Sequence, residues 1–136
     1  MNRYRLTIIF TTLICFIAVA VSSAAAQHGF SVKQYNEFHE VLHPLEHEAL
    51  PGNDFARIRA RSSELVKHGQ AIVKLGVPAG TSDDQKAEFK KELAKFDKAL
   101  KIFRTHSRKG SDAQLKTSFS NVHDSFEMLA SMLPRS

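Results

Sequence analysis

The chain has 136 residues, a length that allows one small domain. Its 19 basic and 14 acidic side chains give a net charge of +5, which is too small and too evenly mixed to indicate nucleic-acid binding. The single cysteine, Cys15, lies in the apolar N-terminal segment. Residues 27–136 therefore have no thiol, and disulfides, thiolate metal sites, iron–sulfur clusters and covalently attached c-type haem are excluded there.

Residues 1–26 have the pattern of a secretory signal peptide. Arg3 and Arg5 precede an apolar run from Leu6 to Val21, and small residues end the segment at Ala26. The alternative is an uncleaved membrane anchor, because the apolar run approaches the roughly 20 residues needed to span a bilayer. Both interpretations predict export, so we expect a periplasmic or secreted domain of residues 27–136. Contact with a membrane is expected only through this segment, if it is not cleaved.

The exact cleavage point decides the role of His28. Cleavage after Ala25 would place His28 third in the chain, where the amine, two backbone nitrogens and the imidazole can bind copper(II) in a square plane. Cleavage after Gln27 would make His28 the first residue, with its amine and ring as ligands. A frayed terminus without a metal is the alternative.

Four segments after the signal peptide have apolar residues at helical spacing, separated by turn residues. No segment alternates like a strand, and the connections are short, so consecutive helices should be antiparallel neighbours. The sequence thus predicts an all-α, up-down-up-down antiparallel four-helix bundle with a phenylalanine-rich core. The predicted helices start and end as follows: from an N-cap at about Ser31 to Pro51-Gly52-Asn53, from Asp54 to Gly76, from Thr81-Ser82-Asp83-Asp84 to Lys109-Gly110, and from Ser111-Asp112 to about Leu133.

Three histidines occur four residues apart in the first helix. Its inward direction is set by the apolar stripe Phe38, Leu42, Leu45 and Ala49. At 100° per residue, His39 lies about 70° from this stripe, His43 about 110° and His47 about 150°. We therefore expect His39 to border the core, His43 to lie on the flank and His47 to face water. Glu46 lies about 50° from inward, where a carboxylate is costly unless protonated, paired or bound to a cation.

Pro44 lies among these histidines. Its ring removes the helical hydrogen bond to the carbonyl of Glu40 and normally kinks a helix. Such a kink would move His47 toward one edge of the helix or the other, and the sequence leaves the direction open.

The fourth helix carries a matching pair. His123 lies about 80° from its apolar stripe and Glu127 about 120°, on the side that an antiparallel first helix would face. The sequence therefore predicts a metal site between the first and fourth helices, and imidazole with carboxylate suits zinc or copper(II). The alternative is a solvated helix edge with a half-buried packing histidine. The predicted ligands are His39, His43, His123 and Glu127, with His47 and Glu46 as further candidates.

The run Phe119-Ser120-Asn121-Val122-His123-Asp124-Ser125-Phe126 resembles, in its placement, the haem-attachment segment of the periplasmic cytochrome c′ family. The two cysteines of that family would fall at Phe119 and Val122, so the covalent attachment is lost here. Residues 43–60, HPLEHEALPGNDFARIRA, also resemble the first hairpin of exported bundles related to these cytochromes. The resemblance implies a bundle that holds a cofactor with its last helix.

These patterns favour an exported bundle that binds copper or zinc for transport, buffering or sensing. One alternative is a non-covalent b-type haem protein with His39 and His123 as axial ligands. Another is an envelope stress or chaperone-like protein that binds unfolded partners without a cofactor. No motif combines a nucleophile with a base and an orienting group, so an enzyme is not favoured. A homodimer is left open, and His68 and His106 are expected to be surface residues.

Overall fold

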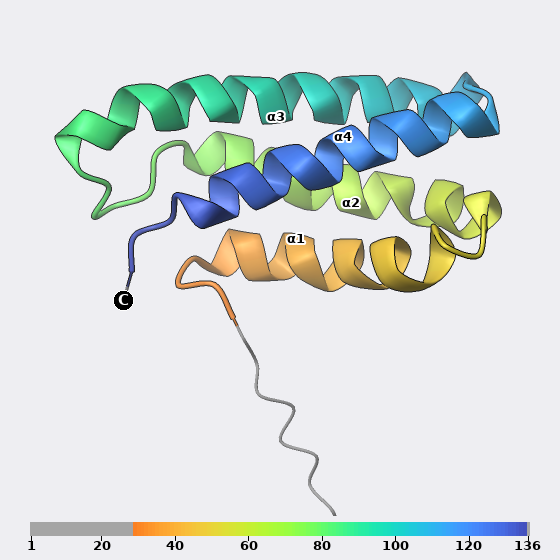
Figure 1. Ribbon diagram of the computed structural model, residues 1–136, viewed down its shortest axis with the longest axis horizontal. Helices are drawn as coiled ribbons and strands as arrows, with labels where there is room; N and C mark the ends of the chain where they lie inside the picture. Colours follow the sequence, from red (N-terminus) through yellow and green to blue (C-terminus); the bar gives the residue numbers. More distant parts are fainter. Residues whose placement is uncertain (1–28, 136) are drawn as a thin grey trace, which may run out of the picture.

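The computed structural model describes residues 29–135, and this part of the chain is all-α (Figure 1). No strand occurs between residues 29 and 135, and no helix in that range has an apolar stretch long enough to cross a bilayer. The predicted signal peptide and His28 lie outside the described residues. The elements are helices α1 (Lys33–Pro44), α2 (Phe55–Leu75), α3 (Asp83–Lys109) and α4 (Asp112–Ser131), with a short π-helix, η1 (Leu45–Ala49), after α1.

Side-chain caps define the starts of α2 and α4, as the sequence predicts. The Asp54 carboxylate accepts a hydrogen bond of 3.0 Å from the backbone N–H of Arg57. At α4, the Ser111 hydroxyl accepts from the Gln114 N–H at 3.2 Å, and the Gln114 side chain accepts from the Ser111 N–H at 2.9 Å. This reciprocal pair satisfies two N–H groups that the helix itself leaves unpaired.

The predicted cap at Ser31 is wrong. Helix α1 begins after Val32, and no side chain caps it. The hydroxyl of Ser31 instead donates to the carbonyl of Pro134 at 3.2 Å. A contact with the far end of the chain has thus replaced the local hydrogen bond that a serine usually makes at a helix start.

Pro44 widens the first helix rather than ending it. Proline has no N–H to donate to the preceding turn, and η1 follows directly. In this segment the N–H of Leu50 donates to the carbonyl of Leu45, five residues earlier, at 2.9 Å. Such a turn holds more residues than an α-helical turn. The helix consequently continues to Ala49 with a changed phase.

One apolar core joins all four helices, and it is rich in phenylalanine as predicted. Six phenylalanines are buried with 2 % exposure or less, together with Tyr35. Most core residues are apolar residues that recur at helical spacing in the four predicted segments: Tyr35, Phe38, Leu42, Leu45, Ala49, Ile58, Leu65, Val66, Ile72, Phe89, Phe96, Leu100, Phe103, Leu115, Phe119, Val122, Phe126 and Leu129.

Aromatic packing connects α1 with α4. The ring centre of Phe126 on α4 lies 4.8 Å from that of Phe38 and 5.8 Å from that of Tyr35, both on α1. Figure 1 shows α4 crossing the bundle obliquely, with its C-terminal end approaching α1. Large rings therefore fill the space that separates these backbones.

Arg59 ties α2 to the turn between α3 and α4. Its guanidinium donates to the carbonyls of His106, Ser107 and Gly110 at 2.9–3.1 Å. It also forms an ion pair of 2.9 Å with Asp112. Because the last carbonyls of a helix have no partner within the helix, Arg59 both caps α3 and fixes its end against α2.

Replacement of Phe126 by alanine should lower the free energy of unfolding by about 3–5 kcal/mol, because it leaves a cavity between α1 and α4. Urea denaturation followed by circular dichroism measures the change. Met128→Ala, at a position of the same helix that is 50 % exposed, is the control and should change stability by less than about 0.5 kcal/mol. Equal effects of both substitutions would contradict this account of the core.

Replacement of Arg59 by alanine should cost about 1–2 kcal/mol, since carbonyls at the end of α3 lose a charged donor. Arg57→Ala is the matched control, because Arg57 makes one exposed ion pair with Glu48 at 2.9 Å. Loss of an exposed pair costs at most about 1 kcal/mol. A smaller loss of stability for Arg59→Ala than for Arg57→Ala, measured by thermal denaturation, would contradict the proposed role of Arg59 in fixing the end of α3 against α2.

Candidate metal centre

The three histidines of the first helix form a continuous row. The ring centres of His39 and His43 are 5.2 Å apart, and those of His43 and His47 are 4.4 Å apart. The first pair has ordinary i, i+4 helical spacing. The second pair spans Pro44 and the start of η1, where the wider turn brings His47 back over His43. The sequence left open the direction in which Pro44 would move His47. In the structure His47 lies on the side of the other two histidines.

The three imidazoles differ in exposure. His39 is half-buried, whereas His43 and His47 are exposed. The ring of His39 stacks on Phe126 with centres 6.2 Å apart and packs against the edge of Phe30 at 5.5 Å. The expected positions of His39 at the core border and His47 in water are confirmed. His39 is consequently held in place, and the other two rings are free to rotate.

Phe30 was not identified by the sequence analysis, although it packs against the candidate site. Its position depends on Asn36, which accepts a hydrogen bond from the Phe30 N–H at 2.6 Å and donates to the Phe30 carbonyl at 2.7 Å. Asparagine in the first turn of a helix commonly bonds to nearby backbone in this way. The asparagine at this position is the sequence feature that could have indicated the contact.

His123 and Glu127 of α4 lie within electrostatic range of His39. Burial lowers the pKa of His39, and the positive charge of His43 lowers it further. The carboxylate of Glu127 opposes this change in the pKa of His39, while His47 and His123 lower it by smaller amounts. The two helices therefore contribute to one electrostatic environment around His39.

The two α4 residues differ in their surroundings. His123 is half-buried, and its Nδ1 lies 3.3 Å from the carboxylate of the neighbouring Asp124. Glu127 is exposed. Within residues 29–135, neither makes a hydrogen bond to the histidine row.

The ligand atoms do not converge in this conformation. Within residues 29–135, no three histidine, cysteine, aspartate or glutamate side chains are placed so that they could hold a metal ion together. Zinc binds nitrogen at about 2.0–2.1 Å, so binding would need side-chain rotation. The exposed His43 and His47 can rotate without disturbing the core.

Two buried side-chain oxygens on α1 and η1 have no hydrogen-bond partner among the described residues. One is Oε2 of Glu46, in η1, and the other is the hydroxyl of Tyr35, in α1. Burial also raises the pKa of Tyr35 above its usual range. Glu46 is half-buried, as the helix phase predicts. A buried carboxylate oxygen without a partner is costly, and a bound water or cation would satisfy it.

His68 and His106 make contacts between elements rather than facing water freely. The Nδ1 of His68 on α2 lies 3.9 Å from the carboxylate of Glu37 on α1. The Nδ1 of His106 on α3 lies 3.1 Å from the carbonyl of Gln114 on α4. Both rings are partly buried, which makes them useful controls for the histidine row.

Comparison with protein-family models, with curated proteins and with solved structures finds no match to this chain. The resemblance to cytochrome c′ accordingly stays a prediction.

The lowered pKa of His39 predicts that stability falls as the pH is lowered. Unfolded histidine takes up a proton near its ordinary pKa of 6.5, whereas folded His39 needs a lower pH. Just below pH 6.5 the unfolded chain therefore binds more protons, and the free energy of unfolding decreases until the folded pKa is passed. Urea midpoints between about pH 7.5 and about pH 5, in the presence of EDTA, measure the effect.

His39→Gln should make this decrease shallower, because it removes the ring whose pKa changes on folding. His68→Gln is the matched control and should leave the slope closer to that of the unmodified protein. An unchanged slope for His39→Gln would show that other groups cause the pH dependence.

Proposed function

We propose that the protein is an exported helical-bundle protein that binds one copper or zinc ion with its histidine row. The observation that carries the proposal is the pair of ring distances, 5.2 Å and 4.4 Å, along His39, His43 and His47. Two imidazoles bound to one ion at about 2.0 Å have ring centres roughly 5 Å apart. Rotation of the exposed His43 and His47 rings, without movement of the backbone, would direct their nitrogens toward the ring of His39.

The α4 residues complete the proposed ligand set. His123 supplies a further imidazole, and the Glu127 carboxylate supplies an oxygen ligand and negative charge. Metal ions bind neutral imidazole, so the lowered pKa of His39 favours its role as a ligand at neutral pH. Glu46, with its unpartnered oxygen, is a further candidate beside the row.

Side-chain packing favours a metal site over the two alternatives, a b-type haem protein and a chaperone-like protein. A haem bound between His39 and His123 would have to displace Phe126, the ring on which His39 lies. A chaperone-like surface would need a continuous apolar patch. The large apolar side chains that are exposed in residues 29–135, Leu75, Ile102 and Met128, belong to three different helices.

Several finer features belong to the same proposal. Export rests on the signal-peptide pattern of residues 1–26, and a second copper site at His28 depends on where that peptide is cut. The up-down-up-down order of the helices is supported by their short connections, two residues long between α3 and α4. Binding rather than catalysis is proposed, in transport, buffering or sensing of the metal.

Isothermal titration of residues 27–136 with zinc and with copper(II) should give one site on the row per chain. His39→Ala combined with His43→Ala should weaken that site at least about 100-fold, because two ligands are lost. His68→Ala combined with His106→Ala removes the same number of imidazoles and should leave it unchanged. Equal affinity in both double variants would disprove the site.

Two further variants locate the remaining ligands. His123→Ala should weaken zinc binding if α4 closes the site, with no change in the number of ions bound by the row. In a protein that begins at Ala26, so that His28 is the third residue, His28→Ala should remove only copper bound at the N-terminus, which electron paramagnetic resonance distinguishes as a square-planar species. Retention of the full affinity in His123→Ala would restrict the site to α1 and η1.

A further inference from the structure

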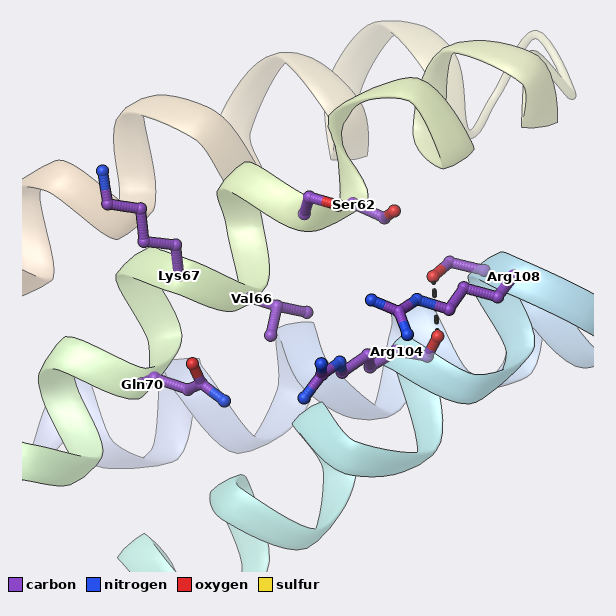
Figure 2. A pocket seen from close by; sticks show the side chains of 8 residues that line it. Ser62, Val66, Lys67, Gln70, Arg104 and Arg108 are labelled. Atoms are coloured by element: carbon purple, nitrogen blue, oxygen red, sulfur yellow. Dashed lines mark hydrogen bonds between the residues drawn. The ribbon is translucent and has the colours of Figure 1, made fainter.

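A second polar site lies between α2 and α3, on helices other than those of the histidine row. It is a cleft of about 180 Å³. Lys67 and Gln70 line it from α2, and Arg104 and Arg108 line it from α3 (Figure 2). The buried residues Ser62 and Ser107 form part of its floor. Basic and amide side chains thus surround a space open to solvent.

Figure 2 shows the guanidinium groups of Arg104 and Arg108 extending from α3 into the cleft, with Gln70 reaching from α2 toward Arg104. No carboxylate lines the cleft. Within residues 29–135, neither arginine forms an ion pair with a carboxylate. Their charges are consequently available to a ligand.

The nearest acidic residues in the sequence are engaged by other basic residues. Asp97 pairs with Lys101 at 2.6 Å and Asp112 with Arg59 at 2.9 Å. Between Asp97 and Asp112 the chain has no acidic residue. This part of α3 therefore carries a strong local positive charge, although the net charge of the whole chain is modest.

The C-terminal end of a helix carries a partial negative charge, which would oppose an anion near Arg108. Arg59 reduces this opposition, because its guanidinium donates to three carbonyls at the end of α3. The same residue fixes the distance between α2 and α3 at this end of the cleft. Arg59 thereby both shapes the cleft and favours negative charge in it.

The positive region extends beyond the cleft. A neighbouring hollow of about 430 Å³ on α3 is lined by Lys101, Thr105 and Lys109, and it shares Arg104 and Arg108 with the cleft. The two arginines thus stand between two basic hollows, and a ligand held by them can extend in either direction.

We propose that this cleft binds a phosphoryl group with two or more negative charges, as in a phosphate monoester or a pyrophosphate. The planar guanidinium groups of Arg104 and Arg108 match pairs of phosphate oxygens. Gln70 adds an amide donor, and Lys67 adds charge at the rim. The phosphoryl group belongs either to a soluble phosphorylated compound or to a lipid headgroup.

Titration of metal-free protein with sodium pyrophosphate tests the proposal. The titration is made at about pH 8, above the ordinary histidine pKa of about 6.5, to limit unspecific attraction of anions. We expect saturable binding, with amide NMR shifts concentrated at residues 62–70 and 104–108. Arg104→Ala combined with Arg108→Ala should weaken it by about 10-fold or more, because charged hydrogen bonds are lost.

The control is Lys86→Ala combined with Lys91→Ala, which removes two charges from the other part of the same helix. It should weaken binding less than about 2-fold, since these lysines are screened from the cleft and pair with Asp83 and Glu88. All four positions are exposed, so both double variants should keep the thermal midpoint of the unmodified protein. No saturable binding, or equal losses in the two variants, would overturn the proposal.

Vesicles distinguish the source of the phosphoryl group. Phosphatidic acid exposes a phosphate monoester, whereas phosphatidylglycerol of equal total charge does not. Preference for phosphatidic acid vesicles that is lost in the Arg104 and Arg108 double variant identifies a lipid headgroup. Pyrophosphate binding without that preference identifies a soluble ligand. Vesicle binding that persists in the double variant, together with no pyrophosphate binding, would overturn the cleft as a phosphoryl site.

Discussion

Phe126 occupies the space between α1 and α4, with ring centres 4.8 Å from Phe38 and 5.8 Å from Tyr35. Residues 29–135 contain no cysteine, so no disulfide stabilises them and apolar packing has to hold the helices together. The same ring is the surface on which His39 lies. The fold and the proposed metal site consequently depend on one side chain.

Pro44 and Arg59 place polar groups around this core in two different ways. Pro44 prevents one helical hydrogen bond, and the wider turn that follows sets His47 against His43. Arg59 satisfies the carbonyls at the end of α3 and holds α2 beside them. The first residue arranges the imidazoles of the proposed metal site, and the second lies beside the cleft proposed to bind an anion. Both proposed sites thus lie beside a place where the regular backbone hydrogen bonds of a helix are interrupted or end.

Local hydrogen bonding explains which helix ends could be predicted. Asp54 and Ser111 cap the residues that follow them within three positions, so their role is visible in a short window of sequence. Ser31 has the same chemistry, but its hydroxyl contacts Pro134, which is 103 residues away. A capping preference is small enough for such a tertiary contact to replace it.

Apolar periodicity and turn residues determined the four helices, most of the core residues and the inner position of His39, because the spacing of apolar residues specifies the buried face of each helix. Only the tertiary structure decided the position of His47 and the packing of Phe30. It also decided that Arg104 and Arg108 line one cleft with residues of α2. These features depend on the hydrogen bonds around Pro44 and on the separation and rotation of whole helices. Packing between distant segments sets those quantities, and no local sequence pattern encodes them.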